Sequence, residues 1–320
     1  MSVCVVHLGA SSTFLAIADD DCRIVSQTLR YVPLYERARQ TYVELIDEVL
    51  SVLLLPGAEA LADQVTALVV TAPTPVAWPS GHVGLCPGMP ALQDRHLRRD
   101  ICERLSQLHK ISPDVLIEND ANAAAILWAS RNPEQGSDPH LHCRLSTGVG
   151  GCIMVEGRPW RGHRSLAGEI GHMTVQPFGT LCGCGNRGCL ETVAGGKALQ
   201  GLYAELLGKT QAPHFMTLLN DWHEYRIDLS RHLQAMGTYL GIGLASAVNL
   251  MNPAFVVVSG PLLDQRSMLR DAMHTEFLQR VCASLECSLI FDETSADDPF
   301  DAGIEVLKHW RRESMQRTVA

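Results

Sequence analysis

A strand, turn and strand pattern occurs in each half of this chain. The first copy joins the apolar run at 3–8 to the run TFLAIA through a turn at 9–12. The second copy lies at 143–157, where CRLST precedes a glycine-rich turn and CIMVEG follows it. Apolar runs on either side of such turns are typical of β-hairpins. The repetition predicts two related lobes, each opened by a hairpin.

Buried strands and amphipathic helices follow each hairpin. The runs at 67–76 and 254–263 are apolar and end at a turn containing Pro or Gly, as expected for strands buried on both faces. The polar, Pro- and Gly-containing segment 132–142 predicts a surface loop. Strands that alternate with helices indicate an α/β architecture. Apolar residues at three- and four-residue steps predict helices at 34–54, 91–110, 119–131, 193–207, 228–251, 265–283 and 302–316.

The composition favours a protein of the reducing cytoplasm. With 320 residues, of which 46% are hydrophobic, the chain can bury a large core in roughly two domains. A net charge of −9 without a long run of one sign argues against a nucleic-acid surface. There is no basic start and no run of about 18 uncharged apolar residues, so we expect neither a signal peptide nor a membrane span. Most of the eleven cysteines are scattered beside apolar neighbours, like ordinary buried thiols.

The segment 167–191 is dense in metal-binding side chains. It carries one histidine and three cysteines spaced His-x₉-Cys-x-Cys-x₄-Cys. Three thiolates and an imidazole suit a closed tetrahedral Zn²⁺ site, and the interleaved glycines allow a tight backbone. The spacing differs from that of a zinc ribbon, and unliganded cysteines near a surface histidine are the alternative. The pattern predicts a structural zinc with no open coordination position, with the ligands His172, Cys182, Cys184 and Cys189.

The run GEIGH, followed by CxCGxxGCxE, resembles the zinc segment of the ROK family of repressors, open reading frames and sugar kinases. The resemblance implies a two-lobed, actin-like (ribonuclease-H-like) α/β fold with a zinc-binding loop. In that family the histidine binds zinc or lies near the sugar, and the two glutamates contact sugar hydroxyls. By this match we expect Glu169, His172 and Glu191 to bind a sugar.

The motif Asn-Asp-Ala-Asn at 119–122 follows the apolar run DVLI and precedes a predicted helix. Taken alone, it is as readily a simple helix N-cap as a functional motif. The resemblance places this Asn-Asp pair at the sugar. It implies that Asn119 orients the sugar and that Asp120, as general base, accepts the proton of the hydroxyl that attacks the γ-phosphate of ATP.

Glycine turns supply the expected nucleotide contacts. The resemblance implies that Thr147, Gly148 and Gly150 of the second hairpin, Gly9 of the first hairpin and Gly260 after the last core strand contact ATP, with Mg²⁺ as its partner ion. Ser146 stands where a glycine is usual in the family. Without the resemblance, such turns are common and carry little information.

The first hairpin departs from the family pattern. The family usually has Asp-x-Gly-Gly-Thr there, whereas this chain has His7-Leu8-Gly9-Ala10-Ser11. His7 replaces an oxygen ligand that suits Mg²⁺, and Ala10 adds a methyl group where the backbone approaches phosphate. An ordinary histidine at a strand end is the alternative interpretation of His7. A second departure is Gly88, which stands where the family has a sugar-contacting asparagine.

These patterns predict an ATP-dependent kinase for a hexose or an N-acylated amino sugar. The alternative is a catalytically degenerate sugar-binding sensor or regulator of the same family. Because only Met1 and Ser2 precede the first strand, we expect no DNA-binding domain and no direct contact with nucleic acid. The resemblance further implies a homodimer. We expect a smaller lobe, 1–117 plus 302–320, and a larger lobe, 118–301, that carries the zinc loop and the sugar site.

Overall fold

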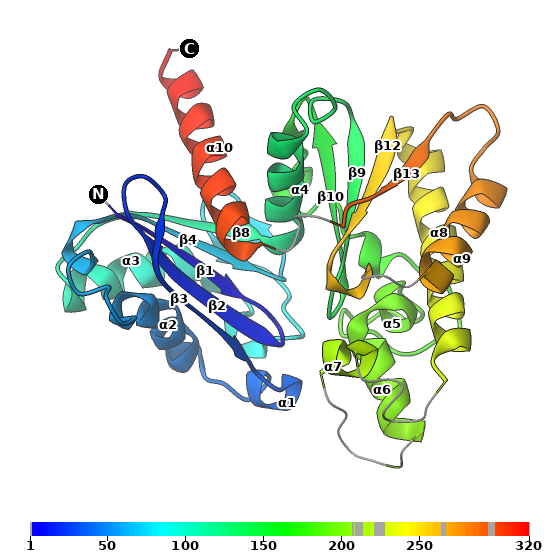
Figure 1. The fold of residues 1–320 in the computed structure, drawn as a ribbon, viewed down its shortest axis with the longest axis horizontal. Helices are drawn as coiled ribbons and strands as arrows, with labels where there is room; N and C mark the ends of the chain where they lie inside the picture. Colours follow the sequence, from blue (N-terminus) through cyan, green and yellow to red (C-terminus); the bar gives the residue numbers. More distant parts are fainter. Residues whose placement is uncertain are drawn as a thin grey trace. The chain divides into compact units, whose positions relative to one another are not determined.

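The computed structural model describes residues 2–206, 208, 214–220, 228–263, 267–293 and 298–319. The chain divides into two compact units. Each unit contains a five-stranded sheet with helices packed against it (Figure 1). The first unit comprises Met1–Pro133, Arg161–Leu166 and Asp298–Ala320, and the second comprises Glu134–Trp160 and Ala167–Asp297.

The sheet of the first unit has the strand order β3-β2-β1-β4-β8. The first three strands pair antiparallel as a meander, whereas β4 and β8 continue the sheet in parallel. Successive side chains of β1 point to opposite faces, so Cys4 and Val6 join one hydrophobic cluster and Val3 and Val5 join another. The strands are β1 (Ser2–Leu8), β2 (Ser12–Ala18), β3 (Ile24–Tyr31), β4 (Val65–Ala72) and β8 (Asp114–Asn119).

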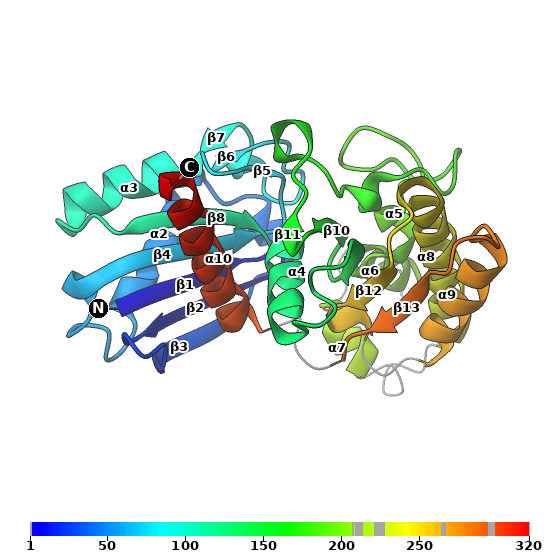
Figure 2. The same cartoon turned by 90° about the horizontal axis from the view of Figure 1, so that it is seen from above.

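Helices cover both faces of this sheet. The clusters place α2 and α3 on the face of Cys4, and α4 and α10 on the face of Val5. Figure 2 shows α10 crossing the sheet. The helices are α1 (Leu34–Arg37), α2 (Tyr42–Leu50), α3 (Leu97–Leu108), α4 (Asp120–Arg131) and α10 (Pro299–Val319), with short 3₁₀ turns at Ser51–Leu54, Ala62–Gln64 and Pro90–Leu92.

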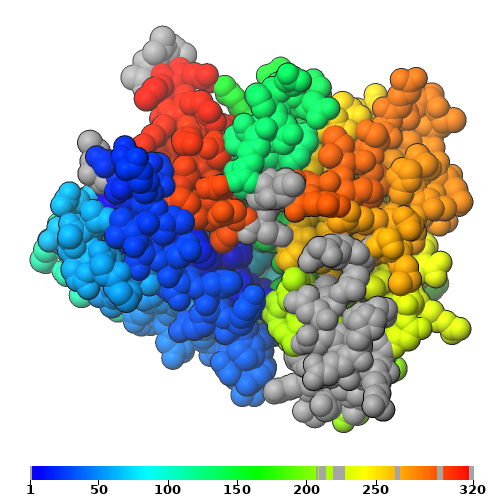
Figure 3. Space-filling view, in the orientation of Figure 1, coloured from blue at the N-terminus to red at the C-terminus, as the bar shows by residue number. Residues whose placement is uncertain are grey.

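The outer parts of the first unit are more exposed. The edge strand β3 carries the exposed apolar side chains Leu29 and Tyr31, and its blue atoms lie on the surface seen in Figure 3. A small separate sheet follows β4. Its strands are β5 (Val76–Ala77), β6 (His82–Val83) and β7 (Arg95–His96).

The sheet of the second unit repeats the connectivity of the first, with the order β11-β10-β9-β12-β13. Again a hairpin pairs antiparallel, and two later strands add in parallel. The repeated order confirms the doubled α/β architecture predicted from the two hairpins. The strands are β9 (His140–Leu145), β10 (Val149–Val155), β11 (Arg158–Pro159), β12 (Phe255–Ser259) and β13 (Ser288–Phe291).

The helices of the second unit pack closely on one another. A Cβ atom at Gly237 or Gly241 of α8 would lie 2.3 or 2.6 Å from a backbone oxygen of α9, so glycine is needed at both positions. No helix of the described residues is long and apolar enough to cross a membrane. The helices are α5 (Glu191–Ala194), α6 (Gly196–Leu206), α7 (Phe215–Asn220), α8 (Ser230–Met251) and α9 (Ser267–Arg280), with 3₁₀ turns at Ile170–His172 and Pro261–Leu263. A further 3₁₀ turn, His163–Ser165, belongs to the first unit.

Some predicted boundaries differ from those of the structure. The surface loop predicted for 132–142 is wrong at its end, because His140 and His142 are buried in β9. His140 stacks on Phe255, and His142 Nε2 lies 2.7 Å from Ser259 Oγ. These two contacts accommodate the polar rings in the core. The helix predicted at 34–54 is divided, since Thr41 caps α2 through a reciprocal hydrogen-bonded pair with Glu44.

The first unit extends through α4 to Pro133, whereas the expected lobe boundary after residue 117 falls within β8. Some predicted positions lie outside the described residues. They are the end of one predicted helix at 207, the start of another at 265–266, and positions 1 and 320 of the expected smaller lobe.

Candidate functional site

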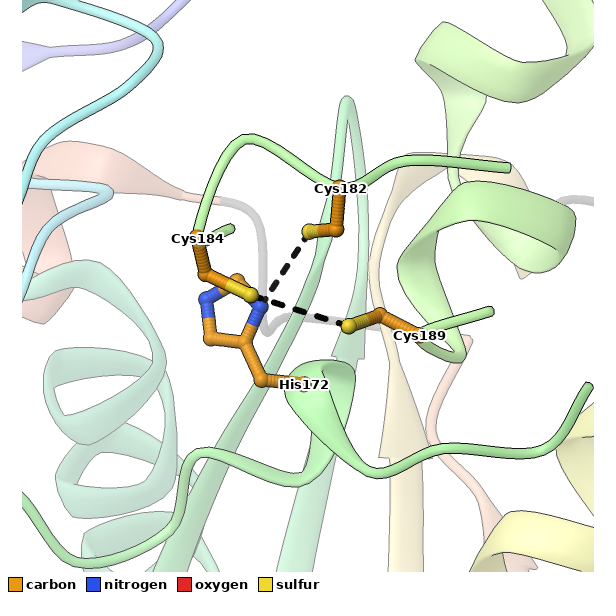
Figure 4. Close-up of side chains that lie close together, drawn as sticks. All are labelled: His172, Cys182, Cys184 and Cys189. Atoms are coloured by element: carbon orange, nitrogen blue, oxygen red, sulfur yellow. Dashed lines mark hydrogen bonds between the residues drawn. The ribbon is translucent and has the colours of Figure 1, made fainter. Parts of the chain in front are cut away.

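Four potential metal ligands converge in the second unit (Figure 4). One ligand atom from each of His172, Cys182, Cys184 and Cys189 lies within 4.8 Å of all the others. Cys182 Sγ is 3.6 Å from His172 Nδ1, and the sulfur atoms of Cys184 and Cys189 are 3.7 Å apart. Ligands of a tetrahedral zinc ion are separated by roughly 3.3–3.8 Å. The four residues grouped by sequence therefore form a set whose chemistry and spacing fit such an ion.

The backbone of the loop fixes this arrangement. Isolated bridges pair Thr174 with Cys189 and Leu181 with Arg187, so the loop folds back on itself. Gly188 has a φ of +68°, and a Cβ atom there would lie 1.5 Å from the carbonyl oxygen of Gln176. Only glycine fits at that position. The density of glycines noted in the sequence thus has a local structural cause.

The thiols of the cluster differ in acidity. Burial raises the pKa of Cys182, and the carboxylate of Glu191, 3.0 Å from its Sγ, raises it further. Burial and the Cys184 thiol likewise raise the pKa of Cys189. Burial opposes ionisation of Cys184 too, but a backbone hydrogen bond from Asn186 and the neighbouring thiols hold its pKa below the ordinary value. A cation bound by all three thiolates must therefore displace protons.

Two of the expected sugar-binding side chains of this unit, Glu169 and Glu191, adjoin the candidate metal cluster through the third, His172. His172 Nε2 is 3.7 Å from Glu169 Oε2, and its Nδ1 is 3.6 Å from Glu191 Oε1. Both carboxylates are partly exposed. With Nδ1 facing the thiols, the Nε2 nitrogen faces Glu169, the usual arrangement of a carboxylate beside a metal-bound imidazole. The structure brings these three residues together on one partly exposed face.

The second hairpin packs directly on this segment. A Cβ atom at Gly151 would lie 2.4 Å from the carbonyl oxygen of Gly168, and one at Gly171 would lie 2.0 Å from that of Val149. A Cβ atom at Gly148 would lie 3.0 Å from Glu191 Oε2. The hairpin and the GEIGH run therefore meet backbone to backbone.

The other expected nucleotide contacts of the second unit lie in and beside this hairpin. The carbonyl of Thr147 accepts a hydrogen bond from the Lys197 N–H at the start of α6. Gly150 pairs with Arg144 across the hairpin. Gly260 follows β12 with a φ of +108°, and a Cβ atom there would lie 2.2 Å from the Leu145 carbonyl oxygen. Packing alone thus requires glycine at 260.

The turn of the first hairpin is occupied by side chains. His7 Nδ1 is 3.0 Å from Thr71 Oγ1, and a Cβ atom at Gly9 would lie 2.8 Å from His7 Nε2. The imidazole therefore lies against the turn. Just beyond it, Thr13 hydrogen-bonds to the buried Arg37 and Glu48, which form an ion pair of 2.8 Å. This network anchors the start of β2 to α1 and α2.

The structure places Asn119 and Asp120 where β8 meets α4. Asn119 Oδ1 accepts hydrogen bonds from the backbone N–H groups of Ala121 and Asn122, so Asn119 is the N-cap. Its Nδ2 donates to the Thr74 carbonyl at 3.1 Å. Asp120 is the partly buried first residue of the helix. The capping interpretation is correct for Asn119. The cap holds the Asn119 amide in one orientation beside Asp120.

A partly buried ion pair next to these residues was not anticipated from the sequence. Arg161 donates to Glu118 Oε2 at 2.7 Å and to Oε1 at 3.1 Å. Its guanidinium lies 4.5 Å from the centre of the Trp78 ring. The only local signal was a glutamate directly after the buried apolar run of β8, which requires a cationic or hydrogen-bonding partner. Nothing in the sequence pattern identified that partner.

The predicted site residues belong to two separate units. Gly9, Gly88, Asn119 and Asp120 lie in the first unit. A Cβ atom at Gly88 would lie 3.8 Å from the Cβ atom of Ala10. The candidate metal ligands and the remaining expected sugar and nucleotide contacts lie in the second unit.

Comparison with known proteins gives consistent matches. The model of the ROK family matches residues 3–302. The xylose repressor of Bacillus subtilis (strain 168) is 32% identical over 216 residues, which cover 65% of this chain and 56% of the repressor. The N-acetyl-D-glucosamine kinase of Erwinia tasmaniensis is 30% identical over 209 residues, covering 62% of this chain and 64% of the kinase. The chain thus matches less than two thirds of the length of these relatives.

A solved structure agrees over nearly the whole chain. The crystal structure of the ROK hexokinase from Thermus thermophilus superposes with a TM-score of 0.67 at 28% identity, covering 97% of this chain and 100% of that chain. The agreement confirms the actin-like α/β fold expected from the sequence.

Proposed function

The chain belongs to the ROK family, and we propose that it is an ATP-dependent kinase for a hexose or an N-acylated amino sugar. One observation carries the proposal: Glu169 and Glu191 lie close to His172, which belongs to a cluster that fits a structural metal. Carboxylates and an imidazole on a partly exposed face can accept from and donate to several sugar hydroxyls. The similarity to an N-acetyl-D-glucosamine kinase and a hexokinase supports this substrate class.

The catalytic step would depend on Asp120. In this proposal its carboxylate takes the proton of one sugar hydroxyl as that oxygen bonds to the γ-phosphorus of ATP and the bond to ADP breaks. Asn119, fixed by the helix cap and by Thr74, has one further amide hydrogen with which to orient the sugar. The glycines of the second hairpin and Gly260 would allow close approach of the nucleotide.

We propose that the cluster of His172, Cys182, Cys184 and Cys189 binds zinc. The ion would serve as a structural element, since four protein ligands leave no position for substrate. Bound zinc can contribute on the order of 10 kcal/mol to the folding of such a loop. Glu169 and Glu191 would owe their placement to that loop. From the family we also expect a homodimer, which light scattering after size-exclusion chromatography would test.

A sugar-binding sensor without catalysis is the second candidate, and the first hairpin favours it. His7 stands where a carboxylate would help to hold Mg²⁺, and its imidazole lies against the Gly9 turn. An imidazole is a poorer ligand than a carboxylate for this hard cation. The similarity to the xylose repressor is compatible with a regulatory role.

One experiment separates the two candidates. Zinc-loaded protein is incubated with ATP, Mg²⁺ and a panel of hexoses and N-acetylhexosamines, and ADP release is measured. A kinase should release ADP with at least one sugar, and Asp120→Asn should lower kcat by at least about 100-fold. A sensor should be stabilised against heat by a sugar but release no ADP, and His7→Asp should then be tested for a gain of turnover. Absence of both ADP release and sugar stabilisation would refute both candidates.

A further inference from the structure

We propose that Arg161 is a positioning residue for the segment that carries Asn119 and Asp120, and that it acts through Glu118. The inference rests on the proposed sugar site, because it assigns a role to a side chain that supports that site from behind. It concerns residues of the first unit alone.

The carboxylate of Glu118 is the centre of this arrangement. Glu118 is fully buried, and its oxygens accept hydrogen bonds from Arg161, from the Asn119 backbone N–H at 2.8 Å and from Asn122 Nδ2 at 2.9 Å. The last two donors belong to residues on either side of Asp120 in the chain. One buried carboxylate therefore holds the backbone before Asp120 and the side chain after it.

Arg161 makes this buried charge tolerable. A carboxylate without a partner is strongly disfavoured in the protein interior, and it becomes protonated or moves toward water. The bidentate pair supplies two parallel hydrogen bonds and the opposite charge. The Trp78 ring lies against the guanidinium and restricts its position. Without Arg161, Glu118 could not keep both of its contacts around Asp120.

The backbone around Arg161 is itself held in place. Residues 161–166 belong to the first unit, although the residues before and after them belong to the second. Arg164 and Ser165 both have a φ of +59°, which is unfavourable for residues other than glycine. The Trp78 backbone N–H donates to Ser165 Oγ at 3.2 Å. The segment is therefore fixed at both Arg161 and Ser165, and it continues in sequence to Glu169.

Turnover and hydrogen exchange of variants test the inference. Arg161→Ala should lower kcat about 10- to 100-fold in protein with unchanged zinc content and circular dichroism, because small displacements of catalytic groups have effects of this size. Arg161→Lys, which keeps the charge but loses the bidentate geometry, should show a smaller loss. Glu118→Gln in the Arg161→Ala background should cause little further loss, since the unpaired charge is gone. The matched control is Arg131→Ala, which removes a partly exposed arginine paired with Asp301 at the other end of α4.

A purely structural role gives a different result. It would lower the melting temperature of Arg161→Ala but leave kcat per folded molecule within about twofold of the wild type, and that outcome would overturn the inference. If Arg161→Ala does not fold, Arg161→Lys and Glu118→Gln give the same comparison.

Failure of the proposed kinase activity is recognised separately. If the wild type itself releases no ADP, hydrogen exchange over residues 118–123 decides the inference. Faster exchange in Arg161→Ala than in Arg131→Ala, together with weaker sugar stabilisation, supports it. Equal exchange in the two variants refutes it.

Discussion

The two hairpins have the same place in their sheets but differ in what fills their turns. In the first unit the turn after β1 is lined by side chains: His7 lies against Gly9, and Thr13 is tied to Arg37 and Glu48. In the second unit the turn after β9 consists of Ser146, Thr147 and Gly148, and its neighbours are mostly backbone atoms and Glu191. Strand pairing and core packing therefore preserve a framework on which the chemistry of a turn can change.

This difference separates stability from ligand binding. Around the first turn, Thr13, Arg37 and Glu48 hydrogen-bond to one another, so these side chains stabilise the hairpin without requiring a ligand. The second hairpin packs against the segment 168–191, which contains the cluster of cysteines. We infer that perturbing the metal site should affect the second hairpin and leave the first unchanged.

The largest expected effect is loss of the metal. Cys184→Ser should abolish zinc binding and destabilise the second unit by several kcal/mol, because the ion would organise the loop. Elemental analysis gives the zinc content, and hydrogen exchange over β10 and β1 separates the two hairpins. Cys282→Ser, which removes an exposed thiol outside the cluster, is the matched control. Equal loss of protection in β1 and β10 would contradict the distinction between the hairpins.

A second effect, of a few kcal/mol, should appear on acidification. Burial, with smaller contributions from the charges of His140 and Arg144, lowers the pKa of His142 from 6.5 to about 3. The folded state thus favours the neutral ring, and its stabilisation is complete above pH 6.5 and lost as the pH falls toward about 3. Burial opposes ionisation of Glu48, but hydrogen bonds from Thr13 and the charge of Arg37 hold the pKa of Glu48 below 4.5. Its contribution is complete above pH 4.5 and is lost only as the pH falls through that lower pKa.

The second unit should therefore lose stability at a higher pH than the first. Hydrogen exchange over β9 and β1 between pH 7 and pH 4 measures this order, and His142→Gln should flatten the dependence in β9. Loss of protection in β9 and β1 at the same pH would contradict the expected order of the two units.

The smallest expected effects come from adding one methyl group to each turn. In Gly9→Ala the new atom would lie 2.8 Å from both His7 Nε2 and the Ser12 carbonyl oxygen, so we expect destabilisation by about 1–3 kcal/mol. In Gly148→Ala it would meet the end of the Glu191 side chain at 3.0 Å, which can move. We expect less than about 1 kcal/mol there, but weaker sugar binding because Glu191 is displaced. Urea unfolding measures the destabilisation, and the sugar-dependent shift in melting temperature measures the loss of sugar binding. Greater destabilisation by Gly148→Ala than by Gly9→Ala would contradict the comparison of the two turns.

The sequence was sufficient for features set by local patterns. The two hairpins, the core strands β4 and β12 and the clustering of the four candidate metal ligands follow from runs and spacings that a short segment contains. The division of the helix predicted at 34–54 was also encoded locally, because Thr41 and Glu44 have the spacing of a capping box. The long amphipathic pattern at 34–54 continues across this capping box and masks it.

Features that depend on distant residues could not be obtained in this way. The pairing of Glu118 with Arg161 joins residues 43 positions apart in the chain. The burial of His142 depends on Ser259, which is 117 positions away. Polar residues are ordinarily placed in loops, so the start of β9 was predicted to be exposed. Only the tertiary partners reveal why these groups are tolerated in the interior.

The discontinuity of the first unit has a consequence for protein synthesis. One face of its sheet, including Val3 and Val5, packs with Ile304 and Val306 of α10. A Cβ atom at Gly303 would lie 2.4 Å from Val5 Cγ1, so this helix packs very closely on the sheet. A ribosome translates the whole second unit before it reaches α10. The part of this sheet face that α10 covers, beside α4, must therefore stay exposed in the nascent first unit during that time, when a chaperone that binds exposed apolar surface would find its target.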